Sequence, residues 1–247
     1  MRLPHPELIE LDDALYRRTM DRMKTKLGIG VPRGGVHVSD LNQCVLKGWA
    51  KKQLESLPPG ALEDDEDDQI LVWVIGRSHE DIFGQGFRRG EPVNEDEIIG
   101  TVDWLDETDL FSEPMVVEMK STRASSKKWL DEMPHYIAQA ASYCCLHEQN
   151  EARVAVLHIM GDYQHQTKEG KAKKLPPRAH LKIYRIRFSD EELRAWWSEQ
   201  KRRRDLILAP EKPRAEDWPE LIPLYEFECV YCRVGNLVGC PNWKEGG

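Results

Sequence analysis

The sequence predicts a mixed α/β fold of the α+β kind, built around one core. Apolar residues recur at helical spacing between Ile70 and Phe87, and two strand-like segments, Ile98–Leu105 and Met115–Met119, follow as a hairpin. With 247 residues, of which 40% are hydrophobic, the chain is long enough for one compact core, and nothing requires two. We expect an N-terminal helical arm over 1–38, a core over 39–224 and a C-terminal cysteine-bearing tail over 225–247.

The N-terminal half contains three further expected features. A helix over Glu7–Lys26 ends before Gly28 and Gly30, and Ser39 is a plausible N-cap for a second helix that carries Cys44. The acidic run Glu63–Asp68 follows a Pro-Pro-Gly turn and is expected to be a solvated loop.

The C-terminal half alternates between helices and strands. Helical periodicity predicts a helix over Pro134–His147, and strand-like segments cover Ala152–Met160 and His180–Phe188. The sequence Ser189-Asp190-Glu191-Glu192 is a capping box, which predicts a last helix that runs through Arg204. The order of elements is therefore helix, strands, helix, strands and helix.

Charge and cysteine content narrow the class of protein. A formal net charge of −8 argues against a protein that coats nucleic acid through bulk electrostatics, although it permits a local basic track. No stretch approaches the roughly 20 apolar residues that span a bilayer, and the N-terminus has no secretory apolar run. We therefore expect a cytoplasmic protein without a membrane partner, in which six cysteines favour metal or redox roles over disulfides.

Two acidic residues and a lysine form the candidate catalytic set. Asp103 ends the strand-like sequence Gly100-Thr101-Val102-Asp103, and Glu118 and Lys120 share one face of the next strand, at its end. Converging carboxylates bind hard ions such as Mg²⁺ or Mn²⁺, and a neighbouring ammonium suits phosphodiester cleavage. An exposed hairpin with an ordinary Glu/Lys pair is the alternative that these residues alone leave open.

The chain resembles the PD-(D/E)XK nucleases of the RecB-like type. Asp103 and Glu118-Met119-Lys120 are similar to the D…(D/E)-x-K core, Gly76-Arg77-Ser78-His79 to the upstream G-x-x-H helix, and Gln139-Ala140-Ala141-Ser142-Tyr143 to the downstream Q-x-x-x-Y helix. The resemblance implies a restriction-endonuclease-like core, with a mixed central sheet flanked by helices. It also implies that His79 and the Met119 carbonyl join Asp103 and Glu118 as metal ligands.

The helix that carries Gln139 and Tyr143 completes the predicted site. These residues lie four apart and so share one helix face, where an amide and a phenol could hold Lys120, a metal-bound water or a phosphate. The sequence departs from the family pattern where Val102 replaces the namesake proline and Glu118 stands where many RecB-like members have Asp. Both departures fall within the variation of the family.

The cysteines predict a second metal site. Cys229, Cys232 and Cys240 lie in the tail, and Cys44 supplies a distant fourth thiolate, a set that suits either zinc or a [4Fe–4S] cluster. The arrangement resembles the iron–sulfur nucleases, including the CRISPR-associated exonuclease of the Cas-four type and the AddB nuclease domain, which favours the [4Fe–4S] cluster. Such a cluster would join the N-terminal region to the tail. Cys144 and Cys145 are expected to be buried small hydrophobes.

Basic residues beyond Lys120 suggest where DNA would lie. Arg123, Lys127 and Lys128 follow the site, and Lys168–Lys174 adds four more lysines. Trp129 could stack on an unpaired base, although packing in the core or at its rim is the favoured interpretation. No sequence-reading motif is present, so specificity should be for strand ends or junctions.

The predicted function is a metal-dependent DNA exonuclease that hydrolyses phosphodiester bonds from single-stranded ends. Its expected setting is CRISPR adaptation or phage and bacterial recombination and repair, with a CRISPR integrase or a recombination protein as partner. One alternative is a metal-stapled DNA-binding adaptor subunit whose partner performs the chemistry. Another is a zinc-containing nuclease that acts on RNA.

Overall fold

The computed structural model describes residues 13–27, 34–54, 67–85, 87–107, 114–161, 178–214 and 240. The helices are α1 (Asp13–Leu27), α2 (Val38–Leu41), α3 (Val45–Leu54), α4 (Asp67–Phe83), the 3₁₀ turn η1 (Leu130–Glu132), α5 (Pro134–Leu146) and α6 (Asp190–Leu208). The strands are β1 (Val36–His37), β2 (Arg88–Arg89), β3 (Val93–Glu95), β4 (Ile98–Gly100), β5 (Trp104–Asp106), β6 (Met115–Thr122), β7 (Glu151–His158) and β8 (His180–Arg187). Among these helices, none is long and apolar enough to cross a membrane.

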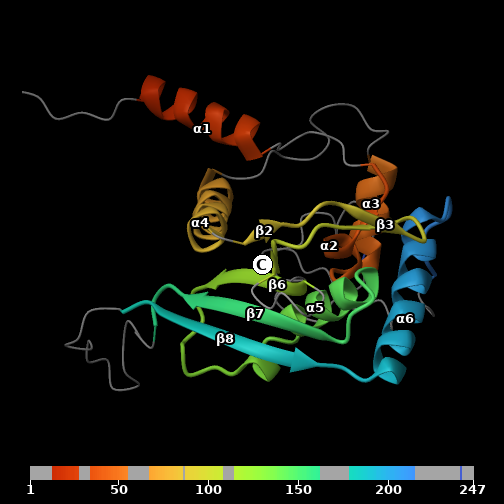
Figure 1. Cartoon of the computed structure of the whole chain (residues 1–247). Coiled ribbons are helices and arrows are strands. Elements are labelled where there is room, and N and C mark those ends of the chain that lie inside the picture. Colours follow the sequence, from red (N-terminus) through yellow and green to blue (C-terminus); the bar gives the residue numbers. More distant parts are fainter. Residues whose placement is uncertain are drawn as a thin grey trace, which may run out of the picture.

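The central sheet has the strand order β2-β5-β6-β7-β8 (Figure 1). Strands β6 and β7 run parallel, paired from Val116 and Ala152 to Thr122 and His158, whereas β5 pairs with β6, and β7 with β8, in antiparallel fashion. A parallel pair needs a crossover connection, and α5 supplies it between β6 and β7. The predicted α+β class, with a mixed sheet flanked by helices, is confirmed.

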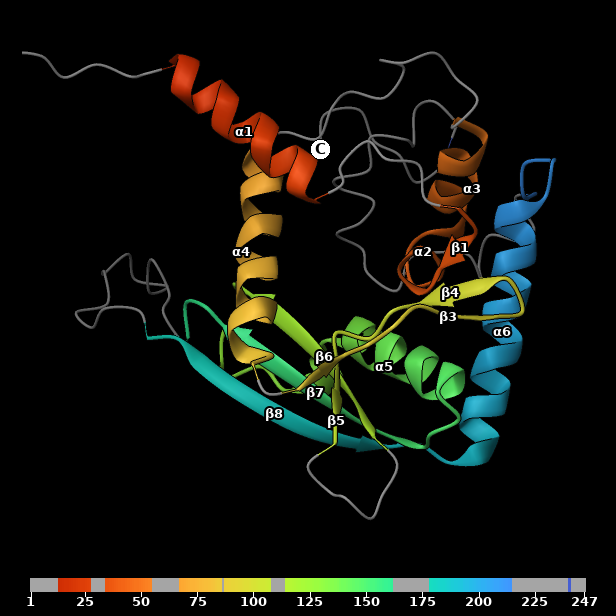
Figure 2. The same ribbon diagram turned by 45° about the horizontal axis from the view of Figure 1, so that its top comes forward.

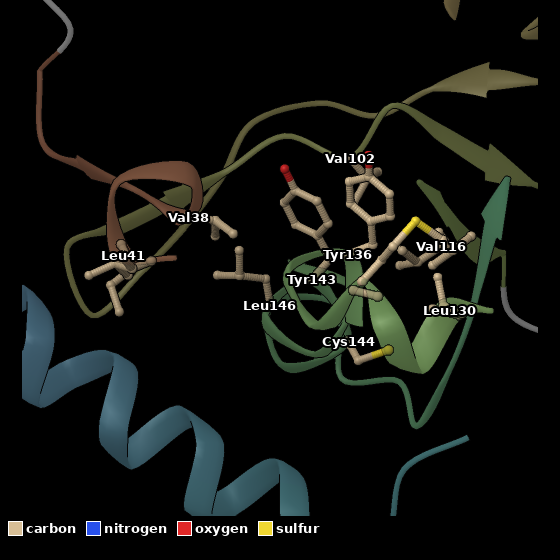
Figure 3. Close-up of a cluster of buried hydrophobic side chains, with 14 of the residues drawn as sticks. Val38, Leu41, Val102, Val116, Leu130, Tyr136, Tyr143, Cys144 and Leu146 are labelled. Atoms are coloured by element: carbon tan, nitrogen blue, oxygen red, sulfur yellow. The ribbon is translucent and has the colours of Figure 1, made fainter. Parts of the chain in front are cut away.

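Both faces of the central sheet are apolar, but they differ in what covers them. On one face Val116, Val154 and Val156 pack with Tyr143 and Leu146 of α5 in the main core, part of which is drawn in Figure 3. On the other face a smaller cluster contains Trp104, Val117, Met119 and Ala155, with Phe87 packed against it. The alternation of β6 side chains between these two clusters is what a strand with a period of two requires.

A second, smaller sheet has the order β1-β4-β3 and lies beside the central one (Figure 2). Its strand β4 and the central strand β5 come from the segment Ile98–Leu105, which the sequence predicted as a single strand. That prediction was wrong, because β4 pairs with β1 and β3 while β5 pairs with β2 and β6. The chain changes sheets over residues 101–103, so Asp103 lies in a bend and not on a strand.

The helix expected to begin at Ser39 and to carry Cys44 is divided in two. The Asp40 carboxylate accepts the backbone N–H of His37 at 3.0 Å, so the first helix begins at Val38 and ends at Leu41. Cys44 therefore lies in the link between α2 and α3, whereas the sequence had predicted it inside a helix. Ser39 is the second residue of α2 and does not cap it.

Other boundaries follow the sequence prediction more closely. Helix α4 begins at Asp67, so the last two residues of the expected acidic loop are helical, while Glu63–Glu66 lies outside the described residues. Strand β6 continues to Thr122, which places Glu118 and Lys120 inside the strand and not at its end. The capping box of α6 is confirmed, because the Glu192 N–H donates to Ser189 Oγ and the Ser189 N–H donates to the Glu192 carboxylate.

Helices α3 and α6 pack side by side at one end of the molecule, away from α4 (Figures 1 and 2). A Cβ on Gly48 would lie 2.9 Å from the end of the Ile207 side chain, so the glycine makes room for this contact between the helices. The Trp49 indole donates a hydrogen bond to the Ala209 carbonyl at 2.9 Å. The end of α6 is therefore fixed against the helix that follows Cys44.

Candidate active site

Asp103 is attached to the edge of β6 by a hydrogen bond. Its Oδ2 accepts the backbone N–H of Met119 at 2.8 Å. The pairing of β6 with β5 extends only to Val117, opposite Trp104, which leaves this edge of β6 open at Met119. The N–H and C=O of one strand residue point to the same side, so the Met119 carbonyl also faces the edge where Asp103 lies. The bend thus places one carboxylate and one backbone carbonyl together beside Glu118.

Glu118 is a buried carboxylate on the face of β6 that packs against α5. It is 1% exposed and forms an ion pair with Lys120 two residues along, as the predicted same-face spacing requires. Apart from that ion pair, neither of its oxygens has a hydrogen-bond partner among the described residues. Burial, and secondarily the charge of Asp103, raise the pKa of Glu118 to about 8 against the opposing effect of Lys120.

Lys120 remains an ammonium in this environment. Burial alone would lower its pKa, but the negative charges of Glu118 and Asp103 outweigh burial, and the pKa is raised. Its side chain is 24% exposed, so the charge reaches the surface of the site. A permanent cation is therefore available beside two carboxylates.

Helix α5 supplies a polar lining on the same side of the sheet. Gln139 Nε2 donates to the Tyr143 hydroxyl at 3.0 Å, as their spacing of four on one helix face permits. Burial, followed by the nearby charge of Glu118, raises the pKa of Tyr143, so the phenol keeps its proton at neutral pH. Figure 3 shows the rings of Tyr136 and Tyr143 extending from the same side of α5. The structure thus brings the Gln139–Tyr143 pair into the neighbourhood of Glu118 and Lys120.

Helix α4 approaches β6 closely and contributes an acidic residue that sequence reasoning missed. A Cβ on Gly76 would lie 3.6 Å from Ser121 Oγ, and Glu80, one turn further along α4, is on the same side. Burial, and next the charge of Asp103, raise the pKa of Glu80, while its carboxylate accepts a hydrogen bond from Arg77 at 2.9 Å. Its position directly after His79 in the G-x-x-H segment was a signal that could have pointed to it.

His79 is half-buried on α4 beside Glu80. Its Nδ1 is buried without a hydrogen-bond partner among the described residues, and its ring lies 6.3 Å from that of Phe83. A buried imidazole nitrogen without a partner is suited to bind a metal ion. Among the described residues, however, no hydrogen bond or ion pair joins His79 to Asp103 or Glu118. His79 is therefore near the predicted metal site without being assembled into it.

The donor set fits a hard divalent cation in its chemistry, since carboxylate oxygens, a backbone carbonyl and one imidazole are typical ligands of Mg²⁺ and Mn²⁺. In the part of the chain that the structure describes, no three His, Cys, Asp or Glu side chains are already arranged to hold one ion. Instead, the Glu118 carboxylate forms an ion pair with the Lys120 ammonium. Binding of a cation would require this ion pair to rearrange.

The predicted cysteine site is only partly within the described residues. Cys44 and Cys240 are half-buried, whereas Cys229 and Cys232 lie outside the described part of the chain. Arg203 of α6 fixes the link that carries Cys44, because its guanidinium donates to the carbonyls of Leu41 at 2.7 Å and Gln43 at 2.6 Å. The backbone around Cys44 is thereby held to the helix from which the tail departs.

Of the two adjacent cysteines of α5, Cys144 is buried as predicted, whereas Cys145 is not fully buried. Cys144 lies in the main core, and burial raises the pKa of its thiol to about 12. Cys145 is half-buried, with a pKa that burial raises to about 11. Cys145 borders a hollow of about 970 Å³ near Arg185 and Trp197, which does not include Asp103, Glu118 or Lys120.

The residues expected to contact DNA are placed in part. Arg123, Lys127 and Lys128 are exposed, and Lys168–Lys174 lies outside the described residues. The interpretation of Trp129 as a core or rim residue was wrong, because its side chain is 64% exposed. Its ring lies beside Lys182 and Tyr184 of strand β8.

Comparisons with known proteins give distant structural likenesses and no family. No protein-family model matches the sequence, and no curated protein matches it. One similar solved structure is described as that of SSO0001, with 15% identity, a TM-score of 0.49 and coverage of 92% of this chain and 96% of that one. Another is a phage-related exonuclease from Haemophilus somnus 129PT, with 13% identity, a TM-score of 0.42 and coverage of 72% and 94%. The function proposed below rests on the site and not on these likenesses.

Proposed function

We propose that this protein is a metal-dependent DNA exonuclease with a PD-(D/E)XK active site. The observation that carries the proposal is Glu118, a fully buried carboxylate near the charge of Asp103, whose one partner among the described residues is the Lys120 ammonium. A buried charge left in this state is costly to the fold. Such a cost is expected where the carboxylate serves a ligand.

Each residue of the site has a role in this proposal. Asp103 and Glu118, with the Met119 carbonyl and His79, would hold Mg²⁺ or Mn²⁺, which when bound acidifies a water and stabilises charge on phosphate oxygens. Lys120 orients the nucleophile and stabilises the negative charge that develops on the phosphate. Gln139 and Tyr143 position the lysine through their mutual hydrogen bond, and Glu80 is a further acidic group facing Asp103.

The finer parts of the proposal concern substrate, cluster and setting. Single-stranded DNA ends are the proposed substrate, since exposed Arg123, Lys127 and Lys128 follow the catalytic strand. Cys44, Cys229, Cys232 and Cys240 would ligate a [4Fe–4S] cluster, with zinc as the alternative, and Arg203 supports the Cys44 end of it. The protein would work in the cytoplasm in CRISPR adaptation or in phage and bacterial recombination and repair, with an integrase or recombination protein as partner.

End-labelled single-stranded and duplex DNA, incubated with protein purified without oxygen, tests the catalytic proposal. We expect wild-type protein to shorten the single strand in the presence of Mn²⁺ or Mg²⁺. Addition of EDTA should stop the cleavage. Lys120→Ala should abolish cleavage, whereas Lys201→Ala should not, because Lys201 pairs with exposed Asp96 far along α6. Wild-type protein that binds DNA without cutting it would instead identify a DNA-binding adaptor.

A further inference from the structure

Trp129 is held in a fixed position although its side chain is exposed. Its backbone N–H donates to the Glu132 carboxylate at 2.8 Å, which closes the turn η1 just before α5. The indole ring lies 6.3 Å from the Tyr184 ring at an angle of 59°. The flat face of an exposed indole, held by these contacts, offers a surface on which a ligand ring can stack.

Lys182 of β8 holds the indole from the side of the sheet. Its ammonium lies 5.5 Å from the Trp129 ring centroid and donates to the Lys128 carbonyl at 3.2 Å. A cation beside an aromatic ring is typical of sites where nucleic-acid bases stack while the backbone runs along positive charge. Lys127 and Lys128, both exposed, lie immediately before the tryptophan.

The sheet places this group close to the catalytic lysine. Lys120 of β6 is in register with Val156 of β7, and Val156 is in register with Lys182 of β8. All three side chains point to the α5 face, and two strand spacings separate Lys120 from Lys182 by about 10 Å. His135 of α5 lies near Lys120 and Lys128, whose charges, after burial, lower its pKa to about 4. About 10 Å corresponds to roughly three stacked nucleotides.

We propose that Trp129 and Lys182 form a stacking platform for an unpaired base of single-stranded DNA, a few nucleotides from the bond cut at Lys120. This inference rests on the proposed nuclease function. A nucleic acid suits the platform better than an apolar protein surface, because the exposed apolar residues of β8, Leu181 and Ile183, lie on its opposite face. Asp131 is exposed nearby, whereas Glu132 is engaged by the Trp129 N–H.

Binding without cleavage tests the platform. Single-stranded oligonucleotides with 2-aminopurine at successive positions are titrated in EDTA with full-length Lys120→Ala protein, alone and combined with Trp129→Ala, Trp129→Phe or Ile183→Ala. Base–aromatic stacking predicts a loss of affinity of roughly 5- to 150-fold for Trp129→Ala. Trp129→Phe should lose less, and Ile183→Ala, an equally exposed residue on the other face of β8, should lose nothing.

The fluorescence of the probe gives the second readout. We expect 2-aminopurine to be quenched at one position about three nucleotides from the end, and this quenching to disappear in Trp129→Ala. Unchanged affinity and unchanged quenching in Trp129→Ala would overturn the platform, and the exposed indole would then serve a protein partner. If wild-type protein binds single strands through Trp129 but never cleaves them, the platform stands and the nuclease proposal fails.

Discussion

Two buried charged side chains, Arg203 on α6 and Glu118 on the central strand β6, have very different hydrogen-bond partners. Arg203 is 6% exposed and donates hydrogen bonds to the carbonyls of Leu41 and Gln43, which joins α6 to the Cys44 link. Glu118 is 1% exposed, and in the described part of the chain its carboxylate has the Lys120 ammonium as its one partner. Arg203 thus has hydrogen-bond acceptors from the backbone, whereas Glu118 has a single side-chain partner.

The difference separates a structural charge from a functional one. A guanidinium with carbonyl acceptors stabilises the contact between distant segments, because each hydrogen bond to a charged group is favourable. A buried carboxylate with a single partner raises the free energy of the folded state, and burial, followed by the charge of Asp103, raises the pKa of Glu118 to about 8. The comparison teaches that a buried charge with incomplete partners is a candidate ligand site.

The largest expected effect is on catalysis. Glu118→Gln removes the negative charge but keeps the shape of the side chain, so metal-dependent cleavage should fall by about 1,000-fold or more. The free energy of unfolding near pH 7 should change little, because the raised pKa already leaves Glu118 largely uncharged in metal-free protein. Single-turnover cleavage and urea denaturation measure the two quantities. A variant that loses both activity and stability would mean that Glu118 is structural.

Arg203→Met should lower the stability of the fold and leave the cleavage activity largely unchanged. The Leu41 and Gln43 carbonyls would lose a charged donor, so the free energy of unfolding should fall by about 3 kcal/mol, as measured by urea denaturation. Arg202→Met is the matched control, because Arg202 forms an i,i+3 surface pair with Glu199 and should cost less than about 1 kcal/mol. Equal stability of the two variants would contradict the assignment of Arg203 as a structural charge.

Glu118 should also make the stability of the metal-free protein depend on pH. The raised pKa of Glu118 means that, between pH 4.5 and about 8, the folded state binds more protons than the unfolded state, so metal-free protein loses stability as pH rises through this interval. The Lys120 pKa is raised and its charge does not change there. Between about pH 6.5 and 8, above the ordinary pKa of the buried His135, denaturation in EDTA should therefore show a falling profile that Glu118→Gln flattens. A wild-type profile as flat as that of the variant would mean that Glu118 is not perturbed.

The smallest expected effect concerns the support of the site by α5. Gln139→Ala removes one hydrogen bond to the Tyr143 hydroxyl, which is worth about 1 kcal/mol, so the cleavage rate should fall roughly fivefold. Steady-state rates at saturating DNA measure this change. A loss as large as that of Glu118→Gln would show that Gln139 acts directly on the reacting groups and does not merely position Tyr143.

The sequence predicted the parts of the site that depend on local periodicity. Alternation along β6 placed Glu118 and Lys120 on one face, and helical spacing placed Gln139 and Tyr143 together, as the structure has them. The capping box of α6 is equally local. These features need no knowledge of which element packs against which, so sequence alone was sufficient.

Features that depend on the pairing of distant segments were not predicted. The bend at Asp103 arises because β4 and β5 join different sheets, and Glu80 enters the site only because α4 approaches β6. Cys44 lies in a link between helices, where Asp40 and Arg203 fix the backbone. The exposure of Trp129 likewise follows from where η1 meets β8, which no local pattern contains.

Binding of Mn²⁺, followed by electron paramagnetic resonance, tests most directly whether the incompletely satisfied carboxylate is a metal site. Wild-type protein should bind Mn²⁺, while Asp103→Asn and Glu118→Gln should bind it at least about tenfold more weakly. Glu151→Gln should leave the affinity unchanged, because the Glu151 carboxylate is taken up by Arg185 and Arg187. Equal Mn²⁺ affinity in wild-type protein, Asp103→Asn and Glu118→Gln would contradict the account.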